Sequence, residues 1–215
     1  MPAEVKICGL TRSIDAEFAD AAGASYLGVI FAGGPRERSP EDARATLTGR
    51  RARKVGVFAA QSAVQISGIA TLVGLDVIQL HGVADAAHVA EVRAATGLEV
   101  WAVVRTSTGV LTAADEHIAD AADALVVDTL VQGQLGGTGV VLPWMELGES
   151  LDAMASGHRI VLAGGLTAVN VGEAIDYVSP MVVDVSSGVE SSPGIKDQKL
   201  VRAFIAAARA SGAAE

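Results

Sequence analysis

The sequence predicts an α/β protein that folds as a single-domain (β/α)8 TIM barrel. Eight short runs rich in Val, Ile and Leu alternate with Ala-rich segments along the 215 residues. This leaves about 27 residues for each unit, close to the minimum for a strand and its crossover helix. The Gly-x-Gly-x-x-Gly fingerprint of a dinucleotide-binding sheet does not follow the first run. We therefore expect one closed barrel over residues 1–215 rather than an open doubly wound sheet.

The apolar runs have the length and composition of parallel strands that are buried on both faces. They cover residues 4–8, 26–31, 54–58, 77–80, 99–104, 124–128, 159–162 and 181–185. Helical periodicity predicts helices over 13–22, 40–47, 63–73, 84–95 and 167–177, and a closing helix over 196–210. Ser39 before Pro40 has the form of an N-cap followed by proline in the first helical turn.

The composition excludes several classes of protein. A formal net charge of −9 argues against a nucleic-acid partner. No apolar run reaches the about 18 residues of a membrane span, and the early acidic residue Glu4 is unlike a secretory signal peptide. Cys8 is the only cysteine, which fits a reducing cytoplasm. We expect a cytoplasmic protein, monomeric or homodimeric, whose partner is a small molecule.

In such a barrel the functional residues stand at the C-terminal ends of the strands. The seventh run is followed by Gly164 and Gly165, and the eighth by Ser186, Ser187 and Gly188. Adjacent glycines let a ligand approach the backbone N–H groups closely. The last two loops of a TIM barrel frequently hold a phosphate. We therefore expect a phosphorylated ligand here, although the Gly-Gly pair alone would fit an ordinary tight turn.

Two apolar strands end in a reactive group: the last residue of the first strand is Cys8, and the last residue of the sixth is Asp128. A lone buried cysteine is more often a core residue, and an aspartate after a strand is often a helix cap. At the mouth of a barrel, however, burial would raise the pKa of Asp128 and let it donate a proton. Cys8 would need an electropositive pocket to act as a thiolate. The residues alone leave open which group is the acid and which the base.

Two more polar residues, Gln79 and His81, end the fourth strand and are candidate substrate contacts. A histidine at a strand end is more often a packed, hydrogen-bonded residue than a catalyst. No cluster of His, Cys, Asp and Glu has the spacing of a metal site, so we expect no metal.

Segments along nearly the whole chain resemble the phosphoribosylanthranilate isomerase family. In order, they are Lys-Ile-Cys-Gly-Leu-Thr-Arg at 6–12, Val-Gly-Val-Phe at 55–58, Gln-Leu-His-Gly at 79–82, Val-Asp-Thr at 127–129, Gly-Gly-Thr-Gly at 136–139, Ala-Gly-Gly-Leu at 163–166, Asp-Val-Ser-Ser-Gly-Val-Glu at 184–190 and Pro-Gly-Ile-Lys-Asp at 193–197. Each segment is weak evidence alone, but the ordered set is highly specific.

The resemblance implies an Amadori rearrangement in tryptophan biosynthesis, from N-(5-phosphoribosyl)anthranilate to 1-(o-carboxyphenylamino)-1-deoxyribulose 5-phosphate. It implies that Asp128 is the general acid that opens the sugar ring, and that Cys8 is the general base at C2′. Arg36 matches the family arginine that meets the anthranilate carboxylate, a contact for which a planar guanidinium is well suited. Gly164, Gly165, Ser186, Ser187 and Gly188 fall on the family's phosphate loops. The resemblance also implies a reaction that needs no metal and no organic cofactor.

The chain departs from the family pattern in two loops. Val140 follows Gly-Gly-Thr-Gly where the family commonly has lysine, and Glu37 follows Arg36 in a short second loop, where Arg38 is a possible substitute for Arg36. Two other functions stay open. One is a histidine-pathway or bifunctional aminoaldose isomerase, in which an aspartate takes the place of Cys8. The other is a barrel that binds a phosphorylated ligand without catalysis.

Overall fold

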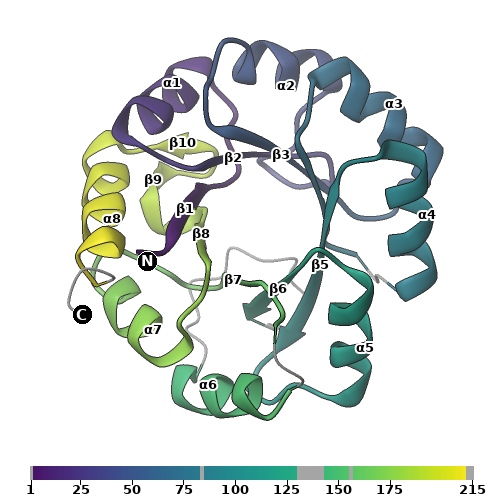
Figure 1. Cartoon of the computed structure of the whole chain (residues 1–215). Coiled ribbons are helices and arrows are strands. Elements are labelled where there is room, and N and C mark those ends of the chain that lie inside the picture. The colour runs from purple at the N-terminus through teal and green to yellow at the C-terminus, as the bar shows by residue number, and fades with distance from the viewer. Residues whose placement is uncertain (1, 83–84, 130–142, 155–156, 212–215) are drawn as a thin grey trace.

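Eight parallel strands close into one barrel in the computed structural model, which describes residues 2–82, 85–129, 143–154 and 157–211 (Figure 1). The strands are β1 (Glu4–Ile7), β2 (Tyr26–Ile30), β3 (Arg53–Phe58), β4 (Val77–Leu80), β5 (Glu99–Thr106), β6 (Ala124–Thr129), β7 (Ile160–Leu162) and β8 (Val182–Val185). Pairing of β8 with β1, from Val182 opposite Glu4 to Val185 opposite Ile7, closes the sheet. The predicted TIM-barrel fold is confirmed.

A ring of helices covers the outside of the barrel (Figure 1). They are α1 (Ser13–Ala22), α2 (Pro40–Leu47), α3 (Ala63–Val73), α4 (Ala86–Thr96), α5 (Ala113–Ala121), α6 (Trp144–Ala153), α7 (Val171–Val178) and α8 (Gln198–Ser211). The predicted cap of α2 is present, because Ser39 Oγ accepts a hydrogen bond from the Asp42 N–H at 3.1 Å and Pro40 opens the helix. Each pair of parallel strands that are consecutive in the chain, from β1 to β8, is thus joined by a crossover helix.

Three predicted helix starts are wrong. One is α4, which begins at Ala86 rather than at residue 84, after its N-cap Asp85. The other two have a clear structural cause. The first is α7, which begins at Val171 rather than at residue 167, because the Thr167 N–H bonds to Asn170 Oδ1 at 2.7 Å in a turn before the helix. The second is the closing helix. Lys196 lies instead in β10 (Ile195–Lys196), which pairs antiparallel with β9 (Glu190–Ser192) after the short 3-10 helix η1 (Ser187–Val189). That hairpin was not predicted.

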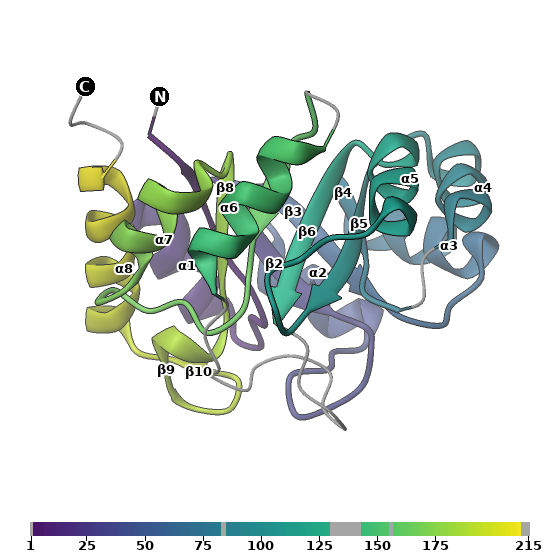
Figure 2. The ribbon, with the colours of Figure 1, turned by 90° about the horizontal axis from the view of Figure 1, so that it is seen from below.

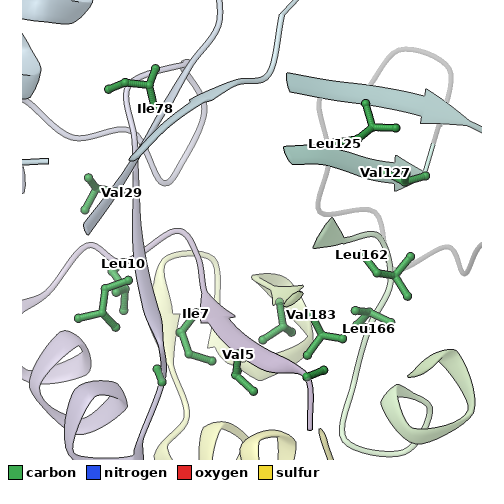
Figure 3. Packing of buried hydrophobic residues seen from close by; sticks show 14 of the residues in the cluster. Val5, Ile7, Leu10, Val29, Ile78, Leu125, Val127, Leu162, Leu166 and Val183 are labelled. Carbon is green, nitrogen blue, oxygen red and sulfur yellow. The ribbon is translucent and has the colours of Figure 1, made fainter. Parts of the chain in front are cut away.

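Successive strand residues alternate between the helices and the barrel interior. Outward residues such as Val5, Ile7, Val29 and Ile78 belong to one large apolar cluster with the helices (Figure 3). Inward residues form a second buried cluster, made of Tyr26, Val55, Val77, Trp101, Val103, Ala124, Val126, Val161, Ala163 and Val182. The interior is therefore a filled core over much of its depth, and only the end above this cluster is left for a ligand.

Charged side chains surround the N-terminal end of the barrel. Glu99 accepts hydrogen bonds from Arg53 at 2.7 Å, Arg159 at 2.8 Å and the Trp101 indole at 2.7 Å. At the opposite end, β9 and β10 lie on the side toward which β6 runs (Figure 2).

None of the helices described is long and apolar enough to cross a membrane.

We predict that Ile78→Ala destabilises the protein by about 2–5 kcal/mol, because it removes buried methyl groups from the outer cluster and leaves a cavity. Ile78 is fully buried, whereas Ile14 on α1 is 60% exposed and gives a matched control. Ile14→Ala should change stability by about 0.5 kcal/mol or less. Urea unfolding measures both variants. Equal losses in the two would contradict this assignment of the core.

Candidate active site

A cavity of about 620 Å³ lies at the C-terminal ends of the barrel strands. Its floor includes the apolar residues Val57, Val126 and Ala163. Every site residue predicted from the sequence lines this one cavity: Cys8, Arg36, Gln79, His81, Asp128, Gly164, Gly165, Ser186, Ser187 and Gly188. Arg36 rather than Arg38 is the arginine of the second loop that reaches it. Segments far apart in the chain are thus combined into one site.

The two loops predicted to bind phosphate, which follow β7 and β8, pack closely against neighbouring parts of the chain. A methyl group at Gly164 (φ +91°) would lie 2.1 Å from Thr129 Oγ1, and one at Gly188 would lie 2.0 Å from the Leu166 carbonyl oxygen. Side chains also hold a carbonyl of each loop, because Asn170 Nδ2 donates to Gly165 at 3.1 Å and Lys196 Nζ donates to Ser186 at 3.0 Å. Both loops are therefore fixed by the protein itself.

Asp128 lies on β6 with its side chain almost completely buried. Burial raises the pKa of Asp128 from its ordinary value of 3.8 to about 6, against the opposing effect of the hydrogen bond that Oδ1 accepts from the Thr129 N–H at 2.8 Å. The negative charge of Asp184 adds to the rise. The carboxyl group can therefore gain and lose a proton close to neutral pH, as predicted for a proton donor.

Cys8 follows β1, and its N–H bonds to the Val185 carbonyl at 2.8 Å. Gly28 on β2 makes room for its side chain, since a methyl group there would lie 2.8 Å from Cys8 Sγ and 3.2 Å from Lys6 Cε. The side chains of Cys8 and Lys6 therefore both lie over Gly28, and the Lys6 ammonium group is the electropositive neighbour that a thiolate requires. Burial nevertheless raises the pKa of Cys8 above 9.0, and the Lys6 ammonium only partly offsets this.

Sequence reasoning missed a buried ion pair beneath the cavity. Lys6 Nζ lies 2.6 Å from Asp184 Oδ2, and the Lys6 side chain has no exposed surface. Burial has the largest single effect and lowers the pKa of Lys6, but the Asp184 carboxylate and Cys8 together outweigh it, so the pKa is raised. The signal was available: Lys6 stands two residues before Cys8 and Asp184 two before Ser186, which on a strand is the same face.

Arg36 is already bound to a carboxylate that sequence reasoning also missed. Its Nε donates to Glu190 Oε1 at 2.9 Å and its Nη2 donates to Glu190 Oε2 at 2.7 Å. Lys196 Nζ donates to Glu190 Oε1 at 2.7 Å from the other side. These hydrogen bonds raise the pKa of Arg36, and they hold the pKa of Glu190 below its ordinary value even though burial opposes this.

Gln79 and His81 line the cavity beside β4. Burial, together with the charges of Arg105 and Lys6, lowers the pKa of His81 to about 4, so the imidazole is neutral at pH 7. Gln79 Oε1 and His81 Nδ1 are buried, and neither has a hydrogen-bond partner in the described part of the chain. Both are therefore polar atoms that a bound molecule could satisfy.

Two features of the sixth loop cannot be placed in the structure. The Gly-Gly-Thr-Gly segment at 136–139 and the departure at Val140 lie outside the described residues. Within the ranges that are described, no group of three or more His, Cys, Asp or Glu side chains could hold a metal ion.

The family model for N-(5'-phosphoribosyl)anthranilate (PRA) isomerase matches residues 5–207. The chain belongs to this family. A relative from Roseiflexus sp. (strain RS-1), an N-(5'-phosphoribosyl)anthranilate isomerase, is 41% identical over 96% of this chain and 97% of its own length. The expected activity, isomerisation of phosphoribosylanthranilate in tryptophan biosynthesis, is thereby confirmed, and the alternative of a barrel without catalysis is not supported.

Solved structures give the same result. A structure of monomers generated from the dimeric phosphoribosylanthranilate isomerase of Thermotoga maritima has a TM-score of 0.82 at 33% identity, covering 97% of this chain and 99% of that one. A phosphoribosylanthranilate isomerase in complex with reduced 1-(o-carboxyphenylamino)-1-deoxyribulose 5-phosphate has a TM-score of 0.81 at 32% identity, with the same coverage. A family member thus binds a phosphorylated ligand with the carbon skeleton of the expected product.

We predict that Asp128→Asn becomes more stable relative to the parent protein as the pH rises. A folded-state pKa of about 6 against an ordinary 3.8 means that the folded parent holds its proton more tightly. The protonated Asp128 therefore contributes to the free energy of unfolding of the parent protein. This contribution is complete below pH 3.8 and is lost as the pH rises through about 6. The asparagine does not titrate, so the difference between the two proteins should grow by about 2–3 kcal/mol across this window.

Urea unfolding of both proteins at a series of pH values between 3.8 and neutral measures the change. Asp152→Asn on α6 is the matched control, because Asp152 is exposed. Its difference from the parent should stay nearly constant. A constant difference for Asp128→Asn as well would show that Asp128 titrates normally.

Proposed function

We propose that the cavity carries out the isomerisation with Asp128 as general acid and Cys8 as general base, while the β7 and β8 loops hold the phosphate. The supporting observation is the order of groups around one cavity. Cys8 follows β1 and Asp128 lies on β6, and the strands between them, β7 and β8, carry the phosphate-loop residues. A pentose anchored by its phosphate between two proton-handling groups meets both of them.

The proposed reaction begins with ring opening. Asp128 donates a proton to the furanose oxygen, which breaks the bond to C1′ and leaves a Schiff base between the sugar and the anthranilate nitrogen. Cys8 then removes the proton from C2′, and the electron pair moves into the imine to give an enolamine. Tautomerisation of the enolamine gives the product ketone. The imine of the substrate accepts the electrons, so protein side chains and the substrate suffice for every step.

At neutral pH the two catalytic groups share one proton between them. With a pKa of about 6 for Asp128 and a raised pKa for Cys8, burial holds that proton on the sulfur in the free protein. The working form is the one in which Asp128 carries the proton and Cys8 is a thiolate. In this form burial keeps the proton on Asp128, although the Lys6 ammonium group opposes it, and the same ammonium group stabilises the Cys8 thiolate. The cationic Schiff base formed by ring opening would add to that stabilisation.

The remaining cavity residues suit the two ends of the substrate. The backbone and hydroxyls of Gly164, Gly165, Ser186, Ser187 and Gly188 would bind the phosphate. Arg36 would meet the anthranilate carboxylate with the edge of its guanidinium that Glu190 does not occupy. Gln79 and the neutral His81 would contact the sugar or its amine through their buried polar atoms. A cytoplasmic location and a monomeric or homodimeric state stay predictions.

We predict that Cys8→Ser and Asp128→Asn each lower kcat by about 10²- to 10⁴-fold, the usual contribution of a positioned proton-transfer group. The fold should persist, because both changes keep the side-chain shape. Loss of phosphoribosylanthranilate is followed by its fluorescence, and urea unfolding checks the fold. Asp152→Asn should keep the parent kcat. Parental turnover in either active-site variant would remove that residue from the mechanism.

Deuterium at C2′ separates the acid from the base. Without its base, proton removal from C2′ limits the rate, so Cys8→Ser should show a larger primary isotope effect on kcat than the parent. Without its acid, ring opening limits the rate, so Asp128→Asn should show an isotope effect close to one. The opposite pattern would exchange the two roles, which charge arguments on the sequence left open.

A further inference from the structure

We propose that Glu190 is a positioning residue that gives the enzyme its preference for a carboxylated aryl amine, by holding Arg36 at the wall of the cavity. The inference rests on the proposed contact of Arg36 with the substrate carboxylate. Glu190 itself does not line the cavity, so it acts through Arg36. It belongs to η1–β9, the segment after the phosphate loop, and is 154 residues away from Arg36 in the chain.

The contact between the two side chains fixes the plane of the guanidinium. Arg36 donates from Nε to both Glu190 oxygens, at 2.9 and 3.2 Å, and from Nη2 to Oε2 at 2.7 Å. A guanidinium has five N–H donors arranged in a fixed fork. Glu190 occupies one edge of this fork, and Nη1 has no hydrogen-bond partner in the ranges that the structure describes. The other edge is therefore oriented before any substrate arrives.

The stem of Arg36 is seated as firmly as its head group. A methyl group at Gly9 would lie 2.6 Å from Arg36 Cδ and 2.8 Å from Ser186 Oγ. The Arg36 stem therefore crosses the backbone of Gly9, a position with φ +70° that favours glycine. The Gly9 backbone holds the stem from below, and Glu190 holds the guanidinium at its end.

Lys196 fixes Glu190 in turn. Its Nζ lies 2.7 Å from Glu190 Oε1 and 3.0 Å from the Ser186 carbonyl, and both charged side chains are at most 4% exposed. Two cations and one anion leave one net positive charge in this cluster, in a chain with a formal net charge of −9. Loss of the Glu190 charge would leave Arg36 and Lys196 without a shared partner, so Arg36 would lose its fixed orientation.

A purely structural role for Glu190 makes a different prediction. If it only held β9 and β10 in place, every substrate would suffer equally. If it positions Arg36, the loss falls on substrates that carry the carboxylate. The probes are therefore N-(5-phosphoribosyl)anthranilate and N-(5-phosphoribosyl)aniline, which lacks that group.

In Glu190→Gln we expect kcat/KM for the anthranilate substrate to fall about 10- to 100-fold, the range for losing a well-placed charge-assisted hydrogen bond. For the aniline substrate we expect a fall of about threefold or less. Glu190→Asp keeps the charge and should restore part of the preference. Glu37→Gln, the same change at an exposed residue of the Arg36 loop, should leave both substrates unchanged. Equal losses for the two substrates in Glu190→Gln would overturn the proposal.

Arg36→Met separates this proposal from the one on which it rests. It should abolish the preference for the carboxylated substrate, and the double variant with Glu190→Gln should be no worse than Arg36→Met alone. If Arg36→Met keeps the preference, the carboxylate contact itself is wrong. If Arg36→Met loses the preference and Glu190→Gln keeps it, only the role of Glu190 is wrong. If Glu190→Gln does not fold, the double variant that combines Glu190→Asp with Lys196→Met replaces it. An unchanged preference for the carboxylated substrate in that double variant would likewise show that the role of Glu190 is wrong.

Discussion

The buried ion pair of Lys6 with Asp184 adds its charges to the effect of burial at three groups of the cavity, Cys8, His81 and Asp128. Its ammonium group opposes the rise in the pKa of Cys8, lowers the pKa of His81 and acts against the rise in the pKa of Asp128. The Asp184 carboxylate acts on Cys8 and Asp128 in the opposite direction. A fully buried lysine is costly unless it is paired. The pairing across the β1–β8 seam therefore makes it possible to place a charge near both groups that we propose transfer protons.

The alternation of side chains along the strands separates stability from chemistry. Inward positions near the N-terminal ends form an apolar cluster around Trp101 and Tyr26, whose rings meet edge to face at 5.0 Å. Further along the same strands, inward positions become polar, as at Gln79, Asp128 and Asp184. The apolar layer supports the polar one and keeps water away from its base. This burial is also what raises the pKa of Asp128.

Most of the fold and many site residues could be predicted from the sequence, because strand ends and short motifs are local signals. Strand parity would also have found Lys6 and Asp184, since each shares a face with a predicted site residue. Glu190 and Lys196 are different. Their roles depend on the β9–β10 hairpin meeting the loop of Arg36 in space, and no spacing in the chain carries that information. The start of α8 was missed for the same reason.

Two charge clusters of different kinds reach the cavity, one through Asp184 and the other through Arg36, and the difference fits the proposed chemistry. The Lys6–Asp184 pair is neutral overall, and it acts on the pKa of both groups that we propose transfer protons, Cys8 and Asp128. The cluster of Arg36, Glu190 and Lys196 has a net positive charge and lies beside the proposed phosphate loop, since Lys196 Nζ donates to the Ser186 carbonyl. In the proposed binding mode, the net positive cluster would attract the anionic groups of the substrate, and the uncharged sugar would lie over the neutral pair. The proposal therefore assigns substrate binding to one cluster and the reaction to the other.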